Sequence, residues 1–163
     1  MNNDEIINEL KNGSPIPDKK DEGVKGEKFV IFLVDDKEYA FPQEIVQEIM
    51  IDSEIYYLPF VPVYIRGLIN RQGEPYTVVD LKIIFGSEKL DAKKFIVIRS
   101  KTDNLSFIIT DILKIIFVNK SDINTIQDKK DINNYFLSII TMKGKEIPVI
   151  DYHKIVRRIK DDI

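Results

Sequence analysis

Residues 66–81 read RGLINRQGEPYTVVDL, in which an apolar run, a polar tip at 70–73 and a second apolar run end in Asp80. Apolar arms on either side of a glycine-containing tip predict two strands joined by a turn. The aspartate is followed at once by apolar residues from Leu81 onward. We therefore expect a short helix to begin after the hairpin, with the Asp80 side chain as its N-cap.

A second copy of this pattern occupies residues 138–152, which read SIITMKGKEIPVIDY. In both copies an isoleucine lies four residues before the turn glycine (Gly73 and Gly144), and an apolar pair lies five and six residues after it. An aspartate follows at seven residues (Asp80 and Asp151) and another isoleucine at eleven. This shared spacing is an internal repeat, and it predicts a fold built from two copies of one unit.

The segments before the two hairpins also correspond. In the first copy, apolar runs at 29–34, 39–41 and 46–51 predict three strands, with a polar turn at 35–38 and a break at Pro42. The second copy repeats this order at 95–98, 105–107 and 112–116, at an offset of 66 residues. A polar insert at 119–134 then widens the offset to 71. We expect repeat units of about 28–94 and 95–163.

About five short strands and one helix in each copy predict an all-β fold whose strands close into barrels. The duplication predicts two small barrels packed against each other, with short helices and a C-terminal helix after Asp151. The runs at 107–109 and 115–118 are apolar at consecutive positions, which predicts burial on both faces. We also expect an apolar cleft with a polar lip between the barrels, open to other proteins.

Residues 1–27 differ in composition from the rest of the chain. Glycines, prolines and charges dominate from residue 11 onward, and little there can be buried. Such a segment cannot offset the entropy of ordering, so we expect a flexible tail. Within it, Ile6, Ile7 and Leu10 would share one side of a short helix, and both a frayed extension and a docking peptide fit this pattern.

The composition excludes several classes of function. A net charge of -3 and the lack of a basic aromatic stripe disfavour nucleic-acid binding. With no cysteine, disulfides and thiolate zinc sites are excluded and a reducing compartment is compatible. No apolar run approaches the ~20 residues of a membrane helix, and the acidic start lacks the basic residues of a signal peptide. We expect a soluble cytoplasmic protein without direct membrane insertion.

The residues also offer no catalytic constellation. The single histidine, His153, has no second histidine or cysteine with which to share a metal, and it fits a solvent-facing position in the last helix. Nucleophile motifs and glycine-rich phosphate loops are absent from the sequence. Asp80 and Asp151 fit helix caps better than paired catalytic carboxylates. We therefore expect neither enzymatic activity nor a cofactor or metal.

The ordered set of motifs resembles the CheW-like domain family of bacterial chemotaxis. The residues that carry it are DDKEYAFP at 35–42, IVQEI at 45–49, RGLIN at 66–70 and VVDL at 78–81, and the likeness extends from about 29 to 159. The resemblance implies two SH3-like, five-stranded barrels without catalytic activity or cofactor. It also implies a scaffold that joins the cytoplasmic tips of transmembrane chemoreceptors to the regulatory domain of the histidine kinase CheA, and that forms rings with other CheW-like domains.

The resemblance further implies partner-binding residues in the third strand and the first hairpin. By position these are Val46, Glu48, Arg66, Gly67, Asn70, Arg71, Gln72 and Gly73. Val46 stands two residues before Glu48, so we expect it to share that face and to supply the apolar part of a contact. Structural roles remain open for several of them: core for Val46, an exposed edge for Glu48, and strand packing or turn formation for the glycines.

The first hairpin departs from the family pattern at its tip. The family turn usually reads Asn-Leu-Arg-Gly, and its arginine pairs with a glutamate at the position of Glu48. Here Gln72 takes the place of that arginine, and Arg71 stands one residue earlier. A shift of one residue along a strand turns a side chain to the opposite face, so Arg71 would reach Glu48 only at an irregular tip. Otherwise Gln72 would offer a neutral hydrogen bond, which is weaker than a charge-assisted one.

The sequence thus predicts a non-enzymatic chemotaxis scaffold, located in the cytoplasm and recruited to membrane-associated receptor arrays. Two alternatives remain. A divergent adaptor of a separate, non-chemotaxis signalling array would carry the same motifs. An SH3-like barrel that binds nucleic acid is the other, which the net charge of -3 disfavours.

Overall fold

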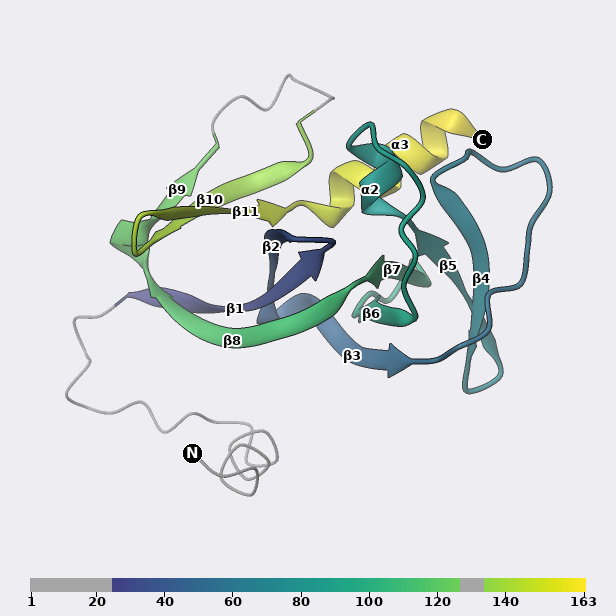
Figure 1. Ribbon diagram of the computed structural model, residues 1–163, viewed down its shortest axis with the longest axis horizontal. Helices are drawn as coiled ribbons and strands as arrows, with labels where there is room; N and C mark the ends of the chain where they lie inside the picture. Colours follow the sequence, from purple (N-terminus) through teal and green to yellow (C-terminus); the bar gives the residue numbers. More distant parts are fainter. Residues whose placement is uncertain (1–24, 127–133) are drawn as a thin grey trace.

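The computed structural model describes residues 25–126 and 134–163, so the expected tail lies outside the described residues up to residue 24. The described part contains eleven strands and few helices (Figure 1), which confirms the all-β prediction. The first repeat supplies β1 (Gly26–Val34), β2 (Lys37–Pro42), β3 (Val46–Ile51), β4 (Ile65–Arg71) and β5 (Glu74–Val79). The second supplies β6 (Lys94–Ile98), β7 (Leu105–Ile109), β8 (Asp111–Asn119), β9 (Ile123–Thr125), β10 (Phe136–Met142) and β11 (Lys145–Ile150).

Two 3-10 turns and two α-helices accompany the strands within the described residues. The 3-10 turns η2 (Gln43–Ile45) and η3 (Lys120–Asp122) follow β2 and β8, and the helices α2 (Leu81–Ile84) and α3 (Tyr152–Asp162) follow the two hairpins. Within 25–126 and 134–163, no helix is long and apolar enough to cross a membrane. The strand β9 lies in the segment that the sequence presents only as a polar insert.

The strands form two sheets that curl into two small barrel subdomains. The six-stranded sheet has the order β8-β1-β2-β11-β10-β9, and the five-stranded sheet has the order β3-β6-β7-β5-β4. In the six-stranded sheet, β1 and β2 of the first repeat lie between β8 and β11 of the second, and in the five-stranded sheet, β6 and β7 of the second repeat lie between β3 and β5 of the first. Parallel pairings of β2 with β11 and of β5 with β7 join the repeats. Neither repeat therefore forms a barrel from its own strands alone.

The duplication extends to the irregularities of the sheets. A register shift skips Gln47 where β3 pairs with β6, and a second one skips Leu113 where β8 pairs with β1. The hairpins show the same correspondence, with shifts at Arg66 in β4 and at Leu137 in β10. These are β-bulges, in which one extra residue bends the strand and changes which face its neighbours occupy.

The junction between the two subdomains is filled by the protein's own side chains. A single core cluster contains residues from both sheets, and the aromatic rings connect them. Phe32 of β1 stacks on Phe41 of β2 with centroids 5.1 Å apart, and Phe41 lies 5.2 Å from Phe107 of β7 in the other sheet. The open cleft expected in the middle of this junction is therefore wrong, because aromatic packing closes it.

The two consecutive apolar runs differ in burial. All five residues of β7 are buried, as the run at 107–109 predicts. In β8, however, Ile115 and Phe117 are each 50% exposed. The prediction of burial on both faces was wrong for β8, since this strand lies at the edge of its sheet and one of its faces is left open.

Both hairpins lead into helices that are capped as predicted. The Asp151 carboxylate accepts a hydrogen bond from the His153 backbone N–H at 3.1 Å. The Asp80 carboxylate accepts from the backbone N–H groups of Lys82 and Ile83 at 3.0 and 3.4 Å. These bonds satisfy backbone groups that the first turn of a helix leaves unpaired.

Asp80 also has a second role. Within the described residues, its counterpart Asp151 makes no hydrogen bonds of this second kind. The Asp80 side chain is fully buried and accepts from the Arg66 guanidinium and the Leu90 N–H, each at 2.9 Å. Arg66 also donates to the Leu90 carbonyl at 2.9 Å. One carboxylate therefore connects β4, α2 and the segment that leads into β6.

We predict that the two caps differ in their effect on stability. The change Asp151→Ala should lower the free energy of unfolding by about 1 kcal/mol, as is usual for a lost N-cap. The change Asp80→Ala should lower it by about 3–5 kcal/mol, because it also leaves the Arg66 guanidinium without its partner. Urea denaturation measures both values, and equal losses would contradict the second role of Asp80. The double variant Arg66→Met, Asp80→Ala should recover part of the loss.

Candidate partner-binding surfaces

Arg71 and Glu48 form an ion pair between the two edge strands of the five-stranded sheet. Glu48 lies in β3 and Arg71 is the last residue of β4, and these strands stand at opposite ends of the sheet order. The Arg71 Nε donates to the Glu48 carboxylate. Its Nη1 donates to the Tyr76 hydroxyl at 3.3 Å, and the guanidinium lies 5.5 Å from the centre of the Tyr76 ring. The pair thus bridges the open side of the barrel.

The strand register explains why Arg71, and not Gln72, reaches Glu48. Residues opposite each other in paired strands point to the same face. Following the pairings from β3 across to β4 gives one shared face, occupied in turn by Glu48, Val97, Ser106, Val78 and Gly67. Arg71 stands four residues after Gly67 and so lies on this face without any irregularity in between. The expectation that Arg71 needs an irregular tip was wrong.

Val46 does not share the face of Glu48. Val46 pairs with Ile98, whereas Glu48 pairs with Val97, because the bulge at Gln47 inserts an extra residue between them. Adjacent residues of β6 point to opposite faces, so their partners do as well. Val46 is half-buried and packs against the main core. The expectation that it extends the contact surface of Glu48 is therefore wrong.

The ion pair stabilises the charged form of Arg71. The hydrogen bond to Glu48 is the main cause that raises the pKa of Arg71 above its usual value. The side chains are 18% and 38% exposed, so the pair stands at the rim of the barrel and remains accessible from solvent. At the corresponding positions of the other barrel the sequence has Met142 and Lys114, which cannot form such a pair.

The turn beside the ion pair is exposed. Gln72 and Gly73 have positive φ angles of 52° and 86°, and the Gly73 N–H donates to the Asn70 side-chain oxygen at 2.8 Å. This geometry is the two-residue hairpin turn that matches the twist of the strands. Asn70, Gln72 and Gly73 therefore form a polar tip next to Arg71, as the sequence groups them.

Arg66 and Gly67 lie at the other end of β4 and have structural contacts. Arg66 is held by Asp80 and the Leu90 carbonyl. Gly67 has a φ of 137°, and a Cβ there would stand 2.2 Å from the Tyr56 carbonyl oxygen. Tyr56 comes this close because it exchanges two backbone hydrogen bonds with Leu68, of 2.7 and 2.8 Å. These two residues are not brought together with the Glu48–Arg71 pair.

The structure has two exposed apolar surfaces. The sequence pattern alone does not distinguish their side chains from those of the core. The first is the loop at 52–64 between β3 and β4, here called the aromatic loop, in which Tyr57 is 82% and Phe60 103% exposed. Phe60 also has a φ of 61°, which is unusual for a bulky residue. The second, the β8 face, consists of Leu113, Ile115 and Phe117, with exposures of 43%, 50% and 50%. Patches of this kind mark binding surfaces.

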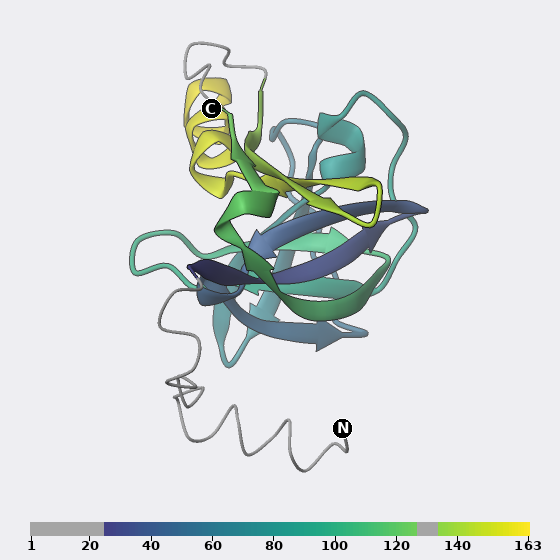
Figure 2. The ribbon, with the colours of Figure 1, turned by 90° about the vertical axis from the view of Figure 1, so that its left-hand side faces the viewer.

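The β8 face lies close to the outer side of β3. Ile51, the last residue of β3, is 62% exposed and pairs with Lys94. The Lys94 amine contacts the Asp111 carboxylate at the start of β8 at 2.7 Å. In both views β3 and β8 run along the same side of the molecule (Figures 1 and 2). Exposed apolar side chains from both barrels thus border this side.

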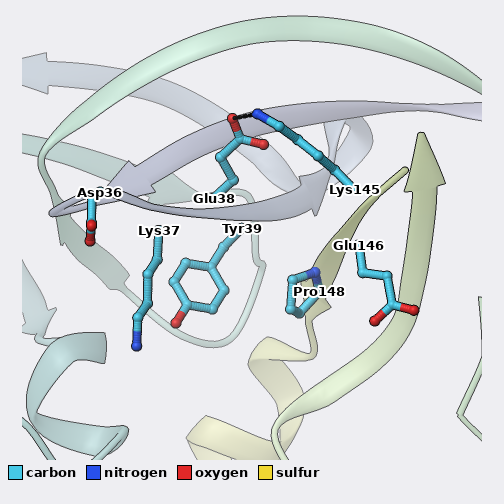
Figure 3. Close-up of a pocket in the computed structure, with 7 residues that line it drawn as sticks. All are labelled: Asp36, Lys37, Glu38, Tyr39, Lys145, Glu146 and Pro148. Carbon is cyan, nitrogen blue, oxygen red and sulfur yellow. Dashed lines mark ion pairs between the residues drawn. The ribbon is translucent and has the colours of Figure 1, made fainter. Parts of the chain in front are cut away.

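A shallow pocket of about 400 Å³ lies over β2 and β11 (Figure 3). Its lining is mostly charged, and Lys145 contacts Glu38 across it at 3.5 Å. The other candidates for chemistry lie apart from it: His153 is exposed on α3, and the part of the chain that the structure describes holds no cluster of three metal-ligating side chains. The geometry of these surfaces suits contacts with macromolecules.

A family model described as the CheW-like domain matches residues 28–160. The chain belongs to the CheW family. The chemotaxis protein CheW of Helicobacter pylori is 24% identical over 135 residues, which cover 80% of this chain and 82% of that protein. The Bacillus subtilis CheW is 26% identical over 136 residues, covering 80% and 87%. The crystal structure of a CheW scaffolding protein from Thermoanaerobacter tengcongensis matches with a TM-score of 0.69 and 25% identity, over 77% of this chain and 89% of that one.

These matches confirm the resemblance drawn from the motifs. They support a CheW-type chemotaxis scaffold with the two-barrel fold of that family. The CheW family is one of scaffolds and adaptors without catalytic activity, which agrees with the character of the surfaces described above. The family arginine of the hairpin turn is replaced here by Arg71 one position earlier, and the pair with Glu48 forms nonetheless.

We predict that Gly67 and Gly73 differ sharply as sites of substitution. The change Gly67→Ala should cost about 3 kcal/mol of stability, because the new Cβ meets the Tyr56 backbone and the φ is unfavourable. The change Gly73→Ala should cost about 1 kcal/mol, since no atom lies within 4 Å of its Cβ and only the φ is strained. Chemical denaturation compares them. A stable Gly67→Ala variant would show that Tyr56 can move away from β4.

Proposed function

We propose that this CheW-family protein couples the cytoplasmic tips of transmembrane chemoreceptors to the regulatory domain of the histidine kinase CheA. The observation that carries the proposal is the presence of two exposed apolar surfaces: the β8 face on the six-stranded sheet and the aromatic loop beside the five-stranded one. A bridging protein needs two surfaces held at a fixed distance and orientation. The core that contains residues of both sheets holds them in this way.

The kinase contact is assigned to the five-stranded barrel. There the Glu48–Arg71 pair and the polar tip lie at one end of β4, and Tyr56 of the aromatic loop is hydrogen-bonded to Leu68 of the same strand. Aromatic and arginine side chains are the usual anchors of protein interfaces, and partly exposed charges at the rim set register and partner choice. Arg71 is already hydrogen-bonded to Glu48. A partner would therefore contact the ion pair mainly through the Glu48 side chain, which is the more exposed of the two.

The receptor contact is assigned to the side bordered by β8 and β3. Ile115 and Phe117 present apolar groups from one barrel, and Ile51 does so from the other. An amphipathic receptor helix can lay its apolar side on such a surface. Kinase control would follow from where the scaffold holds the kinase relative to the receptor, through a shift between states that receptor binding favours differently.

On this proposal the protein acts in the cytoplasm and is recruited to membrane-associated receptor arrays. Rings with other CheW-like domains would use the same barrel surfaces. No cofactor takes part in this function. A second candidate, a divergent adaptor of a separate signalling array, is favoured by Gln72, because the exposed tip presents a neutral amide where the family usually has an arginine.

We predict that Glu48→Arg weakens binding of the CheA regulatory domain at least tenfold. The new arginine would face Arg71 and break the pair. The melting temperature should stay within a few degrees, since ion pairs as exposed as this one contribute only ~0–1 kcal/mol. Titration calorimetry and thermal denaturation measure the two effects. The control Glu146→Arg makes the same charge change on the exposed hairpin of the other barrel and should leave binding unchanged. Unaltered affinity, or a large loss of stability, would contradict the assignment.

We predict that Ile115→Lys abolishes co-sedimentation with receptor-bearing membranes but not kinase binding. A lysine at this position interrupts the β8 face and must be desolvated under a receptor helix. The control Leu137→Lys places the same charge at another exposed apolar position, on β10, and should have no effect. If both variants still sediment with receptors, the receptor contact lies elsewhere. If kinase binding is lost too, the two surfaces are not separate.

A further inference from the structure

The β8 face lies next to the point where the chain enters the fold. Gly26, the first residue of β1, pairs with Asn119 at the end of β8. The Lys120 backbone N–H donates to the Lys25 carbonyl at 2.7 Å. A Cβ on Gly26 would stand 2.6 Å from the tip of the Phe117 ring. Lys25, which follows 24 further residues in the sequence, therefore stands beside one end of this apolar face.

Those residues contain one concentrated apolar segment. Residues 4–10 read DEIINEL, and Ile6, Ile7 and Leu10 have the spacing that places side chains on one side of a helix. The remaining apolar residues before Lys25 are scattered, as with Ile16 between two prolines. The segment thus has an apolar side similar in extent to the three exposed side chains of the β8 face.

The charges of the segment and of the face are compatible. The segment carries Asp4, Glu5 and Glu9. Around the β8 face stand three lysines and three acidic residues, but Asp111 is already paired with Lys94. The others are Lys28, Lys114, Lys120, Glu27 and Asp122. Lys28 pairs with Phe117 and so lies on the same side of the sheet as the β8 face, which favours an acidic occupant, whereas Lys114 points to the opposite side, as Ile116 does.

We propose that residues 4–10 bind the β8 face of the same molecule, with Ile6, Ile7 and Leu10 packed over Ile115 and Phe117. The connecting residues 11–25 allow this. Fifteen residues treated as a random coil have an end-to-end distance of roughly 20 Å, and the distance from Phe117 to Leu113 along β8 is about 13 Å. A segment tethered at this distance has a local concentration on the order of millimolar, so weak apolar contacts suffice.

This binding gives the chain a built-in occupant for the β8 face. The docking depends only on contacts within one molecule and holds whichever partner the protein has. Combined with the proposed receptor contact, it would make the N-terminal segment a competitor that a receptor must displace. The two ideas fail independently, because the first is tested on the isolated protein.

A paramagnetic label tests the docking in the full chain. The protein has no cysteine, so Glu9→Cys accepts a single nitroxide at a polar position of the segment. The backbone amide signals of Ile115 and Phe117 should lose most of their intensity relative to the reduced label. The signals of Leu68 and Tyr76, in the hairpin of the other barrel, should keep theirs. Equal broadening at all four sites, or none, would overturn the proposal.

Matched variants separate docking from mere tethering. Adding Ile6→Asp, Ile7→Asp and Leu10→Asp to the labelled chain should restore the Ile115 and Phe117 signals, whereas Ile16→Asp should not. Broadening that survives the triple change would overturn the proposal. A mixture of labelled protein with isotope-enriched, unlabelled protein should show no broadening. If it does, the face binds the segment of a second copy and the intramolecular proposal is wrong.

Discussion

Each barrel of this protein is completed by strands from the other repeat, and the remaining features depend on this exchange. The parallel pairings of β2 with β11 and of β5 with β7 join the copies. The contact between Phe41 and Phe107 then joins the two subdomains within the larger core cluster, which contains residues of both sheets. Separating the barrels would require breaking both sheets, so surfaces on different barrels keep a fixed distance and orientation. A scaffold that positions two partners needs that rigidity.

Local features of this fold could be predicted from the sequence, because nearby residues determine them. The spacing around Gly73 and Gly144 gave both hairpins, and Asp80 and Asp151 gave both helix starts. The exchange of strands is a long-range choice, since a strand pattern does not say which copy its partner comes from. Edge position is equally non-local, and for that reason the apolar run of β8 looked like core although Ile115 and Phe117 are half exposed.

Single residues of the candidate site show the same contrast between local features, which the sequence predicts, and long-range features, which it does not. Glu48 and Arg71 were grouped correctly by resemblance, but their faces depended on two facts of register. The bulge at Gln47 turned Val46 away, and no pattern of hydrophobicity marks a bulge at a polar residue. Tyr76 was missed although a signal existed: a two-residue turn at Gln72 and Gly73 pairs Arg71 with Glu74, and so places Tyr76 on the face of Arg71.

Comparison of the two repeats separates what the fold requires from what one surface requires. Both copies keep their bulges and their capping aspartates, and both expose an apolar residue at the outer end of the third strand, Ile51 and Phe117. Only the first copy has the ion pair.

The two repeats also differ in how the chain enters their first strands, β1 and β6. The Lys93 carbonyl accepts from the Asp52 N–H at 2.8 Å before β6, much as the Lys25 carbonyl accepts from Lys120 before β1. Before β6, however, the chain is held by Asp80 and Arg66 through Leu90. Of the two equivalent apolar ends, therefore, only that of β8 lies beside Lys25, the residue that follows the N-terminal segment in the sequence.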